Sequence, residues 1–227
     1  MPLQNRVDPF GEIHAVPERG LFMGNRGIIH DPETKTLLKK RWALQAWIIC
    51  VCAFKGKKRD PMGRNRPGGK AGWTELFFLD EVTALSAGHR PCFYCQQERA
   101  KDFAGRFGDA FGIADPKAPE IDKRLHKERL ASGGPLIAVD RAMFDTLPDG
   151  AMVFYGDRPF AKRGRKLRAW TFWGYGDAWD FFDFEFDVWL LTPPTTVEIL
   201  RQGYKPIWHP SIKTEPTEEA LRARRPK

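Results

Sequence analysis

The sequence has no long uncharged hydrophobic run. No stretch approaches the roughly eighteen apolar residues that a membrane-spanning helix needs, and residues 1–15, MPLQNRVDPFGEIHA, lack the apolar core of a secretory signal. Hydrophobic residues nevertheless make up 42% of the chain, which is enough to build a packed core. We therefore expect a folded cytoplasmic protein with no membrane partner.

Several common catalytic motifs are also missing. The chain contains no GxxxxGK[ST] loop, no GxGxxG fingerprint and no GxSxG turn. These motifs carry the phosphate-binding loop of nucleotide hydrolases, the dinucleotide site of Rossmann dehydrogenases and the nucleophile of ordinary esterases. Their absence argues against these three enzyme classes.

Cysteine is scarce, with four in 227 residues. In a reducing compartment this number argues against a disulfide framework and favours metal ligation, catalysis or simple packing. Cys92 and Cys95 form a Cys-x-x-Cys pair directly after a short helical pattern, and Cys50 and Cys52 form a second pair in an apolar stretch. We predict that these four thiolates bind Zn²⁺, because a structural zinc site takes four nitrogen or sulfur ligands in a tetrahedron.

The Cys50–Cys52 pair raises a geometric difficulty. In an extended strand the side chains of residues i and i+2 lie on one face but about 7 Å apart, which is too far for two sulfurs bound about 2.3 Å from one zinc ion. The backbone must therefore bend there, or only one of the two binds. His89, His30 or His14 could replace Cys52, and both thiols could instead be buried packing groups.

The pattern of apolar residues and turns predicts an α+β fold in three parts. Residues 1–113 are expected to form a small zinc-stabilised domain, in which a strand within residues 41–54 pairs with residues 73–79 across a cationic loop. Asp80 and Gly88 are expected to cap and end a short helix, and residues 96–107 to form a second helix. Residues 114–135 read as a helical linker, and residues 136–227 as a small β-barrel-like domain with one helix at 192–204.

One segment resembles a known family. Residues 77–95, FFLDEVTALSAGHRPCFYC, resemble the second half of the zinc-binding domain of bacterial Ada-type alkylation-response proteins, and the match lies chiefly in Arg90-Pro91-Cys92 and Cys95. That resemblance implies zinc, DNA binding and transfer of a methyl group from a phosphotriester to a zinc-bound cysteine. The chain departs from the pattern in its His89 and in the spacing of the upstream cysteines, which weakens the case for methyl transfer. The whole chain also resembles a bacterial family with the signature TELFFLDE…AGHRPCxxC, a resemblance that implies no particular activity.

Positive charge is concentrated in one loop. The net charge is +8, and a Gly- and Pro-rich stretch between Ala53 and Gly72 carries seven cations against one acid. A solvated loop would have the same composition, but a nucleic acid, DNA in particular, is the partner that this charge favours. The predicted nucleic-acid-binding residues are Lys55, Lys57, Lys58, Arg59, Arg64, Arg66, Lys70 and Arg90, and Trp73 or Phe93 could stack on unpaired bases.

Two functions follow as hypotheses. The first is a zinc-stabilised module that binds nucleic acid in DNA repair or processing. The alternative is an enzyme acting on DNA. It would be either a metal-dependent nuclease with His14, His30 or His89 as catalytic residues, or an Ada-like repair protein with Cys50 or Cys52 as a zinc-activated nucleophile. A weaker third possibility is that the β-rich half binds another protein and that the zinc is purely structural.

Overall fold

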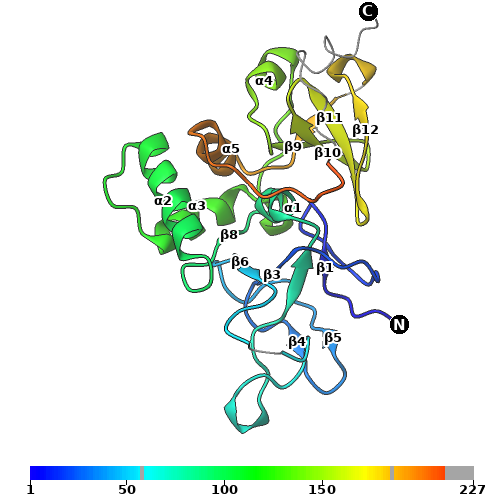
Figure 1. The fold of residues 1–227 in the computed structure, drawn as a ribbon, viewed down its shortest axis with the longest axis vertical. Helices are drawn as coiled ribbons and strands as arrows, with labels where there is room; N and C mark the ends of the chain where they lie inside the picture. The colour runs from blue at the N-terminus through cyan, green and yellow to red at the C-terminus, as the bar shows by residue number, and fades with distance from the viewer. Residues whose placement is uncertain (57–58, 185–186, 213–227) are drawn as a thin grey trace, which may run out of the picture.

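The computed structural model describes residues 1–56, 59–184 and 187–212, and these form a mixed α and β fold with two main sheets (Figure 1). The expected α+β class is confirmed. The first sheet comes from the N-terminal half, in the order β2-β1-β7-β3-β6-β8. Its strands are β1 (Arg6–Val7), β2 (Ile13–His14), β3 (Phe22–Asn25), β6 (Ile48–Val51), β7 (Leu76–Phe78) and β8 (Arg90–Pro91). A separate hairpin consists of β4 (His30–Asp31) and β5 (Thr36–Leu37).

Strand β3 occupies the middle of the first sheet, where the sequence predicted a direct pairing of residues 41–54 with residues 73–79. That prediction is wrong, because β3 pairs antiparallel with both β6 and β7 and separates them. Gly24 makes this insertion possible, since a β-carbon at that position would lie 2.1 Å from the carbonyl oxygen of Ile48. The missing side chain lets β6 approach β3 closely enough to form the ladder.

A short buried helix, α1 (Glu81–Ser86), follows β7 and lies between the two sheets (Figure 1). It begins and ends as the sequence predicted. The Asp80 carboxylate accepts a hydrogen bond from the backbone N–H of Thr83 at 2.8 Å, and Gly88 ends the turn with a φ of 78°. Because β8 follows directly, this helix sets the position of the Cys92–Cys95 turn.

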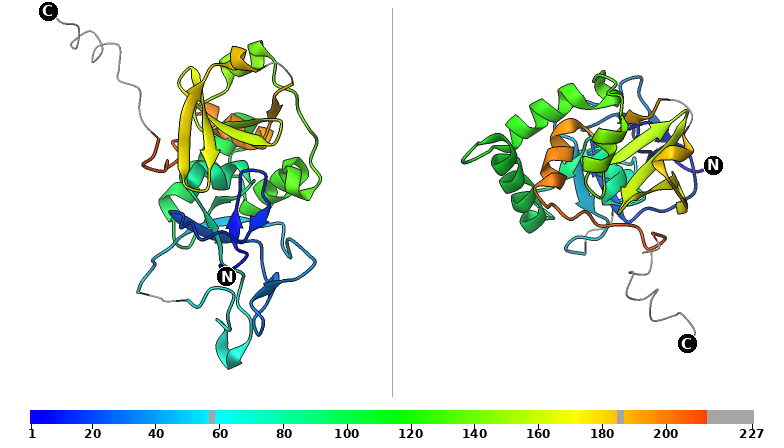
Figure 2. Two further views of the ribbon diagram at one scale, coloured as in Figure 1. Left: turned by 90° about the vertical axis from the view of Figure 1, so that its right-hand side faces the viewer. Right: turned by 90° about the horizontal axis from the view of Figure 1, so that it is seen from above.

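Three further helices pack together at one side of the first sheet: α2 (Gln97–Phe111), α3 (Ala118–Glu128) and α5 (Pro194–Arg201). The predicted inward face of α2 is confirmed, since Ala100, Phe103, Ala104 and Phe107 are all buried. Helix α5 comes from the C-terminal part of the chain but contacts both α2 and α3 (Figure 2). No helix in the described ranges is long and apolar enough to cross a membrane.

The C-terminal half forms an open antiparallel sheet in the order β12-β11-β10-β9-β13. Its strands are β9 (Met152–Tyr155), β10 (Arg158–Arg163), β11 (Lys166–Thr171), β12 (Gly174–Trp179) and β13 (Trp189–Leu190), and α4 (Arg141–Thr146) precedes them. The expected barrel-like closure does not occur among the described residues. The edge strands β12 and β13 do not pair with each other, and β13 is only two residues long, so it cannot extend the ladder around to β12.

The two halves share buried surface. Leu200 and Tyr204 belong to the hydrophobic cluster of the first sheet, while Val82 of α1 belongs to a cluster with Met152 and Trp170 of the second sheet. A distinct zinc domain is therefore not separated from the rest of the described chain.

Candidate metal centre

Three of the four cysteines meet where β6 and β8 run side by side. The two strands pair in parallel, with Ile49 opposite Pro91, and the N–H of Cys92 donates to the carbonyl oxygen of Ile49 at 2.9 Å. This register places Cys50 and Cys92 next to each other at the ends of the strands, and the following turn returns Cys95 to them. The sulfur atoms of Cys50, Cys92 and Cys95 all lie within 4.8 Å of one another.

This spacing suits a metal ion. Three thiolates bound tetrahedrally at about 2.3 Å from zinc would have sulfur–sulfur distances of about 3.8 Å. A small inward movement of the three side chains reaches that geometry. The group can therefore hold one metal ion through three sulfur ligands.

The electrostatics of the three thiols favour binding of a cation. Hydrogen bonding from the Cys50 thiol lowers the pKa of Cys92 to about 5. Burial acts in the opposite direction, and backbone N–H groups, including that of Tyr94, add to the lowering. The same Cys50 thiol lowers the pKa of Cys95, while its bonds to Cys92 and Cys95, together with burial, raise the pKa of Cys50. A bound cation favours the ionised form of each thiol and so displaces the protons that remain on the group.

Buried polar groups hold both sides of the cysteine turn. The Gln96 amide donates to the carbonyl oxygen of Ile49 at 2.8 Å. Arg90 forms two 2.8 Å bonds with the carboxylate of Asp122 in α3, and both side chains are almost fully buried. The structure thus gives Arg90 a role in positioning the turn, whereas the sequence placed it at a nucleic-acid surface. It is not accessible to a phosphate.

Cys52 lies outside the group. Strand β6 ends at Val51, the chain bends, and the Cys52 thiol donates to the carbonyl oxygen of Leu21 at 3.4 Å. Its side chain is exposed. The bend foreseen at this pair thus turns Cys52 away from the other three sulfurs.

None of the three candidate catalytic histidines joins the cysteines. His89 is fully buried between Trp47 and Phe78, and burial, followed by the charges of Arg26 and Arg129, holds its pKa well below the usual value. His30 is also buried and its Nδ1 lies 2.7 Å from the hydroxyl of Thr74, whereas His14 pairs with Asp8 at 2.8 Å. His14 is in β2 of the first sheet, His30 is in the separate β4–β5 hairpin, and His89 lies between α1 and β8, so the three do not form one catalytic group.

The cations of the predicted binding loop have different environments. Lys57 and Lys58 lie outside the described residues. Arg59 stacks on the ring of Trp73 at 4.0 Å and pairs with buried Glu75, and Arg64 pairs with Glu33. Lys55, Arg66 and Lys70 are exposed, and none of them forms an ion pair with an acid in the described part of the chain. A backbone bridge between Arg66 and Lys70 holds those two side by side around a tight turn.

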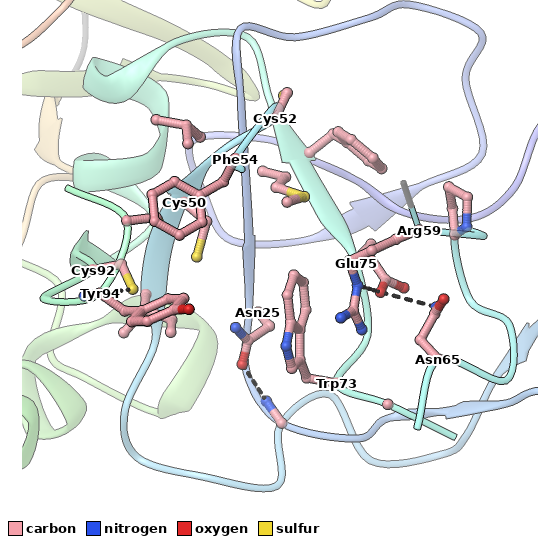
Figure 3. Close-up of a pocket in the computed structure, with 18 of the residues that line it drawn as sticks. Asn25, Cys50, Cys52, Phe54, Arg59, Asn65, Trp73, Glu75, Cys92 and Tyr94 are labelled. Carbon is pink, nitrogen blue, oxygen red and sulfur yellow. Dashed lines mark hydrogen bonds and ion pairs between the residues drawn. The ribbon is translucent and has the colours of Figure 1, made fainter. Parts of the chain in front are cut away.

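The cysteine group lines one part of a large cavity of about 1310 Å³ (Figure 3). The cavity lies against β3, β6 and β7 and under the loop that joins β6 to β7, and its surface is mostly apolar. Aromatic residues contribute much of this lining, among them Phe54, Trp73, Phe77 and Tyr94. Because three sulfurs come from the protein, a fourth ligand of the metal can enter from this cavity.

Sequence reasoning missed two polar residues of the cavity. Asn25 is in the buried central strand, and Glu75 interrupts the apolar run that leads into β7. An acid within such a run was the available signal for Glu75, because a buried carboxylate requires partners. Glu75 has them, since it accepts from Arg59, from the N–H of Met62 at 2.9 Å and from the amide of Asn65 at 3.2 Å.

Comparison with known proteins adds no family assignment. No protein-family model, curated protein or solved structure matches the chain.

Proposed function

We propose that the protein is a zinc protein that binds nucleic acid, and DNA in particular, through cations at the mouth of its cavity. The observation that carries the proposal is the group of three cysteine sulfurs in the wall of that cavity. Three thiolates select a soft or borderline metal, and Zn²⁺ is the ion of this class that takes tetrahedral sites without redox chemistry.

The charge distribution supports a polyanionic partner. Arg66 lines the cavity and is exposed, Lys70 lies beside it, and Lys55 lies near the rings of Phe54 and Tyr94 close to the metal centre. These three cations form no ion pair with an acid among the described residues. Phosphate groups of a nucleic acid are the abundant anions that such an arrangement attracts.

A salt titration tests the binding. Affinity for a single-stranded oligonucleotide, measured by fluorescence anisotropy, should fall linearly with the logarithm of salt concentration. Replacing Lys55, Arg66 and Lys70 by Gln should make that slope shallower by about 2, since each phosphate contact on a single strand contributes about 0.7. A matched triple variant, Lys101→Gln, Lys123→Gln and Lys127→Gln on the exposed faces of α2 and α3, should leave the slope unchanged. No binding at low salt, or equal effects of the two triple variants, would contradict the proposal.

An enzyme acting on DNA is the second candidate, favoured by the fourth coordination position that faces the cavity. A zinc ion with three protein ligands and one water lowers the pKa of that water to about 7 and so supplies a nucleophile for hydrolysis. Such a nuclease would depend on the metal-bound water, since the histidines lie elsewhere. Blank cleavage assays with zinc, manganese and magnesium would remove the nuclease version.

A repair version of the enzyme would use a thiolate as the nucleophile. A zinc-bound sulfur such as that of Cys50 would attack the methyl carbon of a phosphotriester, forming the S–C bond as the C–O bond breaks and the phosphodiester leaves. Peptide mass spectrometry after incubation with methylated DNA would find one added methyl group on Cys50 or, as the alternative, on Cys52. Unmodified cysteines after full exposure to that substrate would remove this version.

A further inference from the structure

The cavity has features that point to a flat aromatic ligand. Its lining combines the metal-binding cysteines, several aromatic rings and a small number of polar side chains, as ligand sites do. A duplex cannot enter a cavity of this size, whereas one unpaired base can. The inference below rests on the proposed function and names the part of the nucleic acid that the cavity receives.

We propose that the cavity binds an unpaired nucleobase, stacked on the ring of Trp73 and contacted at its polar edge by the amide of Asn25. The sugar–phosphate chain attached to that base then runs past Arg66 and Lys70 at the opening.

Trp73 is prepared as a stacking surface. The Arg59 guanidinium covers one face of its ring, 4.0 Å from the ring centre, and is fixed there by its ion pair with Glu75. Glu75 is only 1% exposed and is itself held by Met62 and Asn65. The ring therefore has one supported face, and its half-buried side chain lines the cavity. Bases of every type stack on such a ring, because each has a flat π face.

Asn25 supplies a hydrogen-bond donor next to this ring. Figure 3 shows Trp73 standing between Asn25 and Arg59, so Asn25 lies on the side of the ring opposite the guanidinium. The Asn25 side-chain oxygen accepts the N–H of Gly27 at 3.2 Å, which fixes the orientation of the amide. Its nitrogen points away from that bond, toward the part of the cavity that holds Cys50 (Figure 3), and no described group accepts from it. A base carbonyl or ring nitrogen fits this donor.

The occupant is a nucleotide rather than a purely apolar molecule because of the positive charges beside the cavity. Arg66 lines the cavity, Lys70 lies next to it, and both are exposed. An apolar ligand would gain nothing from these cations, whereas a base carries its phosphates to them.

The test compares two strands of equal charge. The zinc-loaded full chain is titrated with a single-stranded oligonucleotide and with an abasic strand of the same length, so that both present the same number of phosphates. The wild type should bind the base-containing strand about 5- to 150-fold more tightly, the range expected for stacking of one base on an aromatic ring. Trp73→Leu should reduce this ratio to near one and leave the affinity for the abasic strand unchanged.

Three further variants make the result specific. Trp173→Leu removes an exposed tryptophan on the other sheet and should not change the ratio. Trp73→Phe keeps a ring and should retain part of the preference. Asn25→Asp keeps the acceptor for Gly27 but removes the donor, and should lower the ratio by about 2- to 12-fold, as for one lost hydrogen bond.

The possible failures are distinguishable. Equal binding of the two strands by the wild type overturns the base pocket and leaves the proposed nucleic-acid function standing. Binding of neither strand overturns both. A Trp73→Leu variant that weakens both strands equally, with its zinc retained, also contradicts the pocket.

Discussion

The buried ion pair between Arg90 and Asp122 makes a sharp prediction about stability. Arg90 lies two residues before Cys92, and Asp122 is in α3, so the pair joins the metal-binding turn to the helical layer. Their side chains are only 7% and 6% exposed. Removing one member of such a pair leaves a buried charge without its partner, which costs about 3–5 kcal/mol.

The two members should not be equivalent, because a second buried cation lies close by. Arg129 is 1% exposed, and burial, with the charge of Arg90 contributing, lowers its pKa to about 9, whereas the Asp122 carboxylate acts in the opposite direction. Asp122→Asn therefore leaves two neighbouring guanidinium groups without their shared anion. Arg90→Met leaves the Asp122 carboxylate with Arg129 still nearby. We expect a loss near the upper end of the range for Asp122→Asn, about 5 kcal/mol, and a smaller loss for Arg90→Met.

Urea denaturation of the zinc-loaded protein measures both effects. The double variant Arg90→Met, Asp122→Leu should recover most of the loss, since apolar replacement of a buried pair is often close to neutral. The control is Asp145→Asn, which removes an exposed i,i+4 pair with Arg141 and should change stability by less than about 0.5 kcal/mol. A loss below about 1 kcal/mol for Asp122→Asn, or a larger loss for Arg90→Met, would refute the reasoning.

Three other predictions concern the fold. The pKa of His89 is depressed, so below about pH 6.5 the unfolded chain binds a proton that the folded protein does not, and stability should fall with decreasing pH. His89→Gln should reduce the slope of unfolding free energy against pH by up to about 1.4 kcal/mol per pH unit, measured by denaturation at pH 5 to 7. An unchanged slope would contradict this prediction. The Asp80 carboxylate accepts hydrogen bonds from Thr83, from the hydroxyl of Tyr175 and from the N–H of His209. Asp80→Asn should therefore lower the unfolding free energy by about 2 kcal/mol or more, whereas Asp140→Asn at the exposed cap of α4 should lower it by about 0.5 kcal/mol or less. Equal losses would show that the buried hydrogen bonds contribute nothing. Gly24→Ala should destabilise the protein by about 3 kcal/mol or more, because its β-carbon would clash with Ile48. In Gly105→Ala, in α2, the β-carbon meets nothing within 4 Å, so this variant should stabilise the protein by about 0.5 kcal/mol. A tolerated Gly24→Ala would disprove the close approach of β6 and β3.

The parts of the structure that sequence could predict are those set by neighbouring residues. Asp80 and Gly88 enclose α1 because a cap and a left-handed glycine act within a few residues. The buried face of α2 follows from the spacing of Phe103 and Phe107. Cys92 and Cys95 lie together because the turn between them is short.

The parts that sequence could not predict depend on distant segments. The insertion of β3 between β6 and β7 is decided by Gly24 meeting a strand far along the chain, and no local pattern marks it. In the sequence, Arg90 cannot be told apart from an arginine on the surface. Only its ion pair with Asp122 of α3 explains why it is buried. The bend after Val51 separates Cys50 from Cys52, so the identity of the third ligand emerges only from the fold.

X-ray absorption at the zinc edge tests the central claim most directly. We expect one zinc ion per chain with three sulfur neighbours at about 2.3 Å and one oxygen or nitrogen neighbour at about 2.0–2.2 Å. Cys52→Ser should leave this spectrum unchanged, whereas Cys50→Ser should remove a sulfur or the metal itself. Four sulfur neighbours, or protein that holds no stoichiometric metal after purification and zinc loading, would contradict a three-thiolate centre with its fourth position open to the cavity.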